Sequence, residues 1–125
     1  MSAQVSHFEL PVDDLARASE FYSKVFGWNV FTIPTGSTLV GTTPSDADGR
    51  PTVPGGINGG LAVRGGAITT PVVTVTVEDI DASLQAVEEH GGKRVQEKVS
   101  VGDFGFVAYV TDSEGSVLGL WQNAG

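Results

Sequence analysis

The sequence contains no cysteine, so it has no disulfide bonds and no thiolate to act as a metal ligand or nucleophile. It also lacks a long apolar run and a basic leader, so neither export nor membrane insertion is expected. Positive charge is scarce, since 7 lysines and arginines accompany 15 acidic residues and leave a formal net charge of -8. We therefore expect no nucleic-acid or membrane partner, and take the cytoplasm as the default compartment.

What the chain does contain is typical of a globular protein. Hydrophobic residues make up 40% of its 125 residues, and 17 glycines supply many turns. A chain of this length buries about two thirds of the surface that it exposes when unfolded. We predict a single domain over residues 1–125.

The sequence repeats itself once. A shift of 65 residues places Asp14 on Asp79 and Gly27 on Gly92, with helical apolar spacing between each pair. Only two copies are present, which favours a duplicated module over an open solenoid. We place module one at about residues 1–65 and module two at about residues 71–125.

Each module is predicted to have the order βαβββ, which makes the fold class α+β. An aspartate caps the start of each helix, and glycine ends it. The runs with strand character are Val5–Val12, Asn29–Ile33, Thr38–Thr43 and Gly60–Arg64, then Val72–Val77, Arg94–Val101, Phe106–Val110 and Val117–Gln122.

The segment Pro44–Asn58 interrupts this pattern. It reads PSDADGRPTVPGGIN and has no hydrophobic period. We predict a long surface loop, which is a candidate lid over a pocket.

The opening SHFELPVDDLARASEFYSKVFGW, the repeat VTVEDIDASLQAVEEHGGK and the ending DSEGSVLGLWQ resemble the vicinal oxygen chelate superfamily. That family includes glyoxalase I, extradiol dioxygenases, fosfomycin-modifying enzymes, methylmalonyl-CoA epimerase and metal-free bleomycin-binding proteins. The resemblance implies that the two paired modules form one curled mixed-sheet cleft with helices on the outside. It also implies a homodimer.

Metal-dependent members of this family hold a divalent ion with His or Glu from the first and last strand of each module. The matching positions here are His7, Gly60, Val72 and Gly119, and only His7 carries a donor side chain. We therefore predict no metal and no other cofactor. Glu9 shares a strand face with His7, which leaves open a nonstandard ion held by this pair.

The resemblance and the strand alternation together give a substrate-binding set, whereas no catalytic residue is assigned. Five of its members also have a structural interpretation: His7 and Glu9 as an internal pair, the two glycines as relief of crowding, and Trp121 as core. Glu9 needs a partner, for which His7 and Arg64 are the candidates. The predicted set is His7, Glu9, Gly60, Arg64, Val72, Gly119 and Trp121.

Three functions follow from these observations. The first is a glyoxalase-like or bleomycin-resistance-like protein that binds a small organic molecule in the cleft without a metal. The second is a lyase, isomerase or dioxygenase-type enzyme that uses His7 and Glu9 with an unorthodox ion or as a general base. The third is a structural or interaction module without catalysis.

Overall fold

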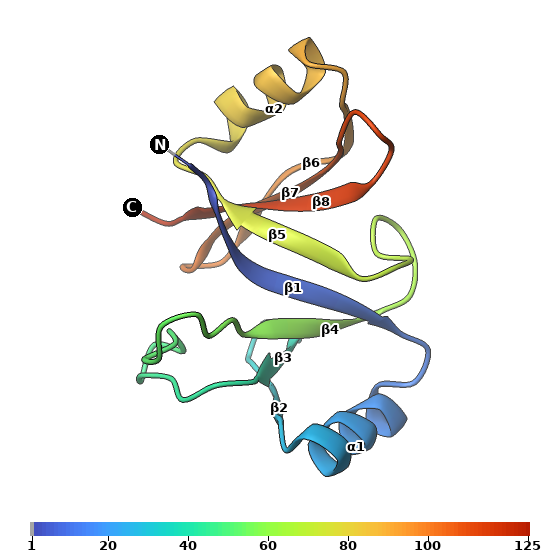
Figure 1. Cartoon of the computed structure of the whole chain (residues 1–125), viewed down its shortest axis with the longest axis vertical. Helices are drawn as coiled ribbons and strands as arrows, with labels where there is room; N and C mark the ends of the chain where they lie inside the picture. The colour runs from blue at the N-terminus through green and yellow to red at the C-terminus, as the bar shows by residue number, and fades with distance from the viewer. Residues whose placement is uncertain (1) are drawn as a thin grey trace. The chain divides into compact units, whose positions relative to one another are not determined.

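The structure is a computed structural model that describes residues 2–125. These residues form two helices and eight strands in the order βαβββ-βαβββ, which confirms the predicted α+β class and the duplication (Figure 1). The elements are β1 (Gln4–Val12), α1 (Leu15–Phe26), β2 (Asn29–Thr32), β3 (Thr38–Gly41), β4 (Gly59–Val63), β5 (Val72–Thr76), α2 (Ile80–Glu89), β6 (Lys93–Val101), β7 (Gly105–Thr111) and β8 (Val117–Asn123).

The chain divides into two compact units. One unit comprises His7–Pro71, and the other comprises Val72–Gly125 together with residues 2–6. Within the first unit the strands run in the order β2-β3-β4-β1, with β1 and β4 parallel and the other pairs antiparallel. Within the second the order is β5-β8-β7-β6, with β5 and β8 parallel. The prediction of one single domain stays a prediction.

Both helices begin where the aspartates predict. The Asp14 carboxylate accepts a hydrogen bond from the Arg17 amide at 3.0 Å, and Asp79 accepts from the amides of Asp81 and Ala82. Such caps satisfy amides that have no partner within the helix. The first helix ends at Gly27, whose φ of 71° is a left-handed conformation that glycine adopts at low cost.

Each helix covers one face of the strands in its own unit. In module one, Val12, Val40 and Leu61 are buried, and α1 residues pack against them. In module two, Ile80 and Leu84 of α2 pack with buried residues of β7 and β8. The opposite face of each set of strands carries the predicted site residues that lie within strands, because successive side chains of a strand point to alternate faces. Arg64 follows β4 and lies beside α1 instead.

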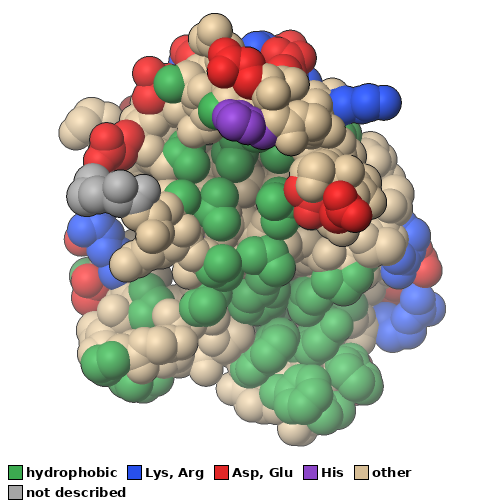
Figure 2. Space-filling view, turned by 45° about the horizontal axis from the view of Figure 1, so that its top comes forward, with side chains coloured by type: hydrophobic (Ala, Val, Ile, Leu, Met, Phe, Trp, Pro, Cys, Tyr) green, Lys and Arg blue, Asp and Glu red, His purple; other side chains and the backbone are tan. Residues whose placement is uncertain are grey.

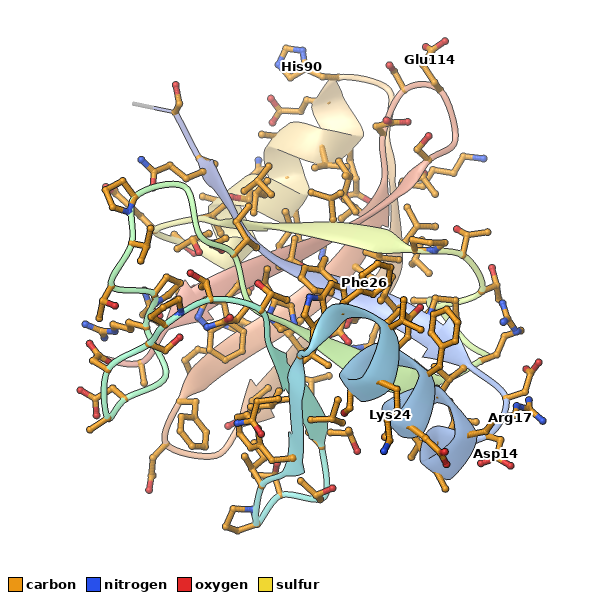
Figure 3. All side chains as sticks on the ribbon, turned by 60° about the horizontal axis from the view of Figure 1, so that its bottom comes forward. Asp14, Arg17, Lys24, Phe26, His90 and Glu114 are labelled. Carbon is orange, nitrogen blue, oxygen red and sulfur yellow. The ribbon has the colours of Figure 1, made fainter. Side chains whose placement is uncertain are left out.

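Module one also has a cluster of aromatic side chains at the edge of its core. The rings of Tyr22 and Trp28 stack with their centroids 5.1 Å apart, and Phe26 packs against both. Phe21 and Phe26 are nevertheless 53% and 58% exposed. Figure 2 shows hydrophobic side chains gathered on the surface of the molecule, and Figure 3 shows Phe26 at the end of α1, with Arg17 at its start.

The segment Pro44–Asn58 is a surface loop, and the Asn58 side chain ties several parts of it together. The Asn58 side chain accepts a hydrogen bond from the Thr42 amide at 2.8 Å and donates to Ser45 Oγ and to the Gly49 carbonyl. An isolated antiparallel β-bridge between Ser45 and Pro51 also holds two parts of the loop together. The predicted loop is confirmed, and its role as a lid stays a prediction.

Candidate functional site

The first part of the site is a hydrogen-bonded pair on β1. His7 and Glu9 lie two residues apart on an extended strand, so both side chains point to the face opposite α1. His7 Nε2 lies 2.9 Å from Glu9 Oε1, and the two side chains are 30% and 19% exposed. Of the two partners predicted for Glu9, the structure selects His7.

The glycine opposite this pair makes room for the carboxylate. Gly60 of β4 is the register partner of Glu9. A Cβ at Gly60 would lie 3.0 Å from Glu9 Oε2 and 3.2 Å from the Thr38 carbonyl oxygen. A side chain at this position would therefore push against the carboxylate, so the space that Gly60 leaves is used by Glu9 itself.

Apolar side chains extend the same face away from the pair. Leu39 of β3 is the register partner of Gly60, and Phe31 of β2 is the register partner of Leu39. Phe31 is 41% exposed. The face thus combines one polar pair with a partly accessible apolar surface, and we call His7, Glu9, Gly60, Leu39 and Phe31 the open face of module one.

The equivalent positions of module two are buried and leave no space for a ligand. Thr74 follows Glu9 by the 65-residue shift and is the register partner of Gly119, as Glu9 is of Gly60. A Cβ at Gly119 would lie 2.5 Å from Thr74 Oγ1. Thr74 and Val72 are only 3% and 1% exposed. Sequence reasoning missed Thr74, although the repeat shift that matched His7 with Val72 also matches Glu9 with Thr74.

Trp121 lies two residues beyond Gly119 on β8, so the two share a face as predicted. The indole Nε1 donates a hydrogen bond to Asn123 Oδ1 at 2.8 Å. The one polar donor of this side chain is therefore already used, and its remaining surface is apolar. Its assignment to ligand binding stays a prediction.

Arg64 lies near the start of α1 and pairs with another acid. Its Nε lies 2.9 Å from Asp13 Oδ1, and its Nη1 donates to the Thr69 carbonyl. A hollow of about 310 Å³ adjoins these residues and is also lined by Arg17 and Phe21. Arg64 is thus engaged by Asp13 and Thr69, and its role in substrate binding stays a prediction.

The described residues do not fit the divalent ion that the family resemblance implies. No group of three or more His, Cys, Asp or Glu side chains within residues 2–125 is placed to hold a metal. The open face of module one offers two such side chains, and His7 Nε2 is already engaged by Glu9. Protein sites for catalytic ions of this kind usually supply three ligands.

Arg94 and His90 of module two have structural contacts. Arg94 on β6 contacts Glu97 and Glu88, and the hydrogen bond to Glu97 is the main cause that raises the pKa of the guanidinium. His90 ends α2, where its amide donates to the carbonyls of Ala86 and Val87 (Figure 3). These groups belong to the surface of module two.

Comparison with known proteins agrees with this architecture. The sequence model of the Glyoxalase/Bleomycin resistance protein/Dioxygenase superfamily matches residues 4–120. The chain belongs to this superfamily, which is the vicinal oxygen chelate superfamily. This confirms the resemblance seen in the sequence.

Individual relatives share parts of the chain. A glyoxylase-like domain-containing protein of Didymella fabae is 32% identical over 106 residues, covering 82% of this chain and 79% of the relative. The anthracycline biosynthesis protein DnrV of Streptomyces peucetius is 28% identical over 131 residues, covering 92% of this chain but 45% of the relative. The chain therefore spans less than half the length of DnrV.

The superfamily fold is also found in solved structures. Methylmalonyl-CoA epimerase of Streptomyces coelicolor, solved in complex with 2-nitronate-propionyl-CoA, superposes with a TM-score of 0.69 over 100% of both chains. Its sequence identity of 16% supports the shared fold alone.

Among residues 2–125, no helix is both long and apolar enough to cross a membrane.

Proposed function

We propose that the chain binds a small organic molecule on the open face of module one and does so without a divalent metal. The observation that supports this proposal is the His7–Glu9 pair, which is a polar anchor on the same strand face as the apolar side chains of Leu39 and Phe31. Ligand sites commonly combine mainly apolar walls with a few fixed polar groups. The open face of module one has both features, and neither of them needs an ion.

A second candidate function is proton transfer, since a histidine oriented by a carboxylate is a common general base. The pair supports this candidate too. Proton abstraction next to a carbonyl also requires a group that stabilises the oxyanion. The register partners beside Glu9 are Gly60 and Leu39, whose side chains supply neither a cation nor a hydrogen-bond donor. We therefore rank binding before catalysis, and we propose a homodimer as the assembled form.

Metal analysis tests the metal-free part of the proposal. The protein is purified without chelators and its metal content is measured by mass spectrometry, alongside the variant His7→Gln. We expect well below one equivalent of any divalent ion in both samples. A stoichiometric ion that a chelator removes, and that is lost in His7→Gln, would refute the metal-free assignment.

A thermal-shift screen of small aromatic and dicarbonyl compounds tests binding. A ligand that binds only the folded state raises the melting temperature, by an amount that grows with its concentration. We expect at least one compound to raise it in the unmodified protein and in His90→Gln, but not in His7→Gln. The chain has only two histidines, so His90 is the matched control. An equal shift in both variants would remove His7 from the site.

A further inference from the structure

The hydrogen bond between His7 and Glu9 on β1 has a defined donor and a defined acceptor. A carboxylate only accepts hydrogen bonds, so the imidazole nitrogen that faces Glu9 must donate one. His7 Nε2 lies 2.9 Å from Glu9 Oε1, so the proton belongs on Nε2. A neutral imidazole carries a single N–H, which leaves Nδ1 with a lone pair and no proton.

The carboxylate that imposes this direction is held in place. Glu9 Oε2 lies in the space opposite Gly60, where even a Cβ would come within 3.0 Å of it. The Glu9 side chain is 19% exposed, and its strand is paired with β4. Its freedom to turn away from His7 is therefore small, so we treat Glu9 as a positioning residue.

Nδ1 remains available to a ligand. Within residues 2–125, no hydrogen bond engages this atom, and the His7 side chain is 30% exposed. Its charged neighbour is the Glu9 carboxylate, and the apolar side chains of Leu39 and Phe31 lie farther across the same face. The chain as a whole carries a formal charge of -8, which repels anions.

We propose that Glu9 fixes His7 as the Nε2–H tautomer, so that the site accepts the hydrogen-bond donor of an apolar molecule, a hydroxyl or N–H group, and rejects a carboxylate. The inference rests on the proposed function, because it names the class of ligand for the same face. It also argues against assigning to this chain a ligand like the 2-nitronate-propionyl-CoA of the methylmalonyl-CoA epimerase structure, because that ligand is an anion.

The tautomer is tested on the free protein. Long-range proton–nitrogen spectra of the imidazoles are recorded at mildly alkaline pH, where an ordinary imidazole is neutral, and His90→Gln assigns the His7 signals. We expect Nε2 to be proton-bearing and Nδ1 to be unprotonated, with a wider separation of the two resonances than in the exposed His90. Glu9→Gln should narrow that separation toward the His90 value. A proton on Nδ1, or no difference between the two histidines, would overturn the tautomer assignment.

The ligand class is tested with three probes of the same shape: naphthol, its methyl ether and naphthoate. Titrations are followed by the amide spectrum of the protein. Naphthol should bind several-fold to about tenfold more tightly than the ether, as expected for one hydrogen bond, and naphthoate should bind least. Equal binding of naphthol and the ether, or preference for naphthoate, would overturn the ligand class while leaving the proposed function standing. No binding by any probe would overturn the ligand class and count against the proposed function, and the spectra would still decide the tautomer.

Discussion

The fit between Thr74 and Gly119 predicts a specific loss of stability. The variant Gly119→Ala adds a Cβ that would lie 2.5 Å from Thr74 Oγ1 and 3.2 Å from Thr74 Cβ. Thr74 is 3% exposed and lies on β5, which is paired with β8 in this region. Rotation of the Thr74 side chain would still leave Thr74 Cβ at 3.2 Å from the new methyl group, because this atom is fixed to the backbone of β5. The added methyl group therefore overpacks the interior.

Overpacking of this kind costs about 1–3 kcal/mol of unfolding free energy. For a chain of this size, that loss lowers the melting temperature by about 4 °C for each kcal/mol. Urea unfolding measures the free energy directly. Gly41→Ala is the matched control, because a Cβ there would meet its nearest atom, Asn29 Cβ, at an ordinary 3.7 Å. We expect this control to change stability by less than about 0.5 kcal/mol.

The variant Thr74→Ala completes a double-mutant cycle. It removes Oγ1 and Cγ2, which are two of the three atoms nearest to the added Cβ. In that background, Gly119→Ala should lose less than half of the stability that it loses alone. An undiminished loss, or a Gly119→Ala variant as stable as the unmodified protein, would refute the claim that Thr74 fills this space.

Two further changes test local features. Asp79→Ala removes a cap that accepts hydrogen bonds from two backbone amides, so it should lower the unfolding free energy measured in urea by about 1 kcal/mol. Asp14→Ala should lower it less, because Asp14 accepts one such hydrogen bond. Equal losses in the two variants would argue against the number of capping hydrogen bonds as the cause. Asn58→Ala removes three of the hydrogen bonds that hold the surface loop, so proteolysis within residues 44–57 should become faster. Asp48→Ala in the same loop should leave the rate unchanged, and equal rates in all three proteins would contradict this role of Asn58.

Local sequence signals predicted the elements well. Asp14 and Gly27 bound the first helix as expected, because caps depend on residues that are neighbours in the chain. Strand bounds were correct to within about two residues, as at β3, which ends at Gly41 rather than Thr43. The superfamily was also identified correctly, because several separate motifs agree in order.

The contents of the site were harder to predict. Alternation placed His7 and Glu9 on one face, but only the register of β1 with β4 shows that Glu9 fills the space at Gly60. Sequence left Arg64 and His7 as equal partners for Glu9. The register decides between them, because Glu9 lies opposite Gly60, whereas Arg64 lies four residues farther along and engages Asp13. Cross-strand register is a non-local property, and a sequence pattern does not contain it.

The spaces opposite Gly60 and Gly119 show that the two modules of a duplicated protein can take different roles. Gly60 and Gly119 face the same strand position in their respective modules, yet one gap holds a carboxylate tied to an imidazole and the other holds a buried threonine. The threonine half contributes packing, which tolerates little change. The carboxylate half keeps its polar atoms within reach of solvent, so new specificity is more readily acquired by substitutions around Glu9 than around Thr74.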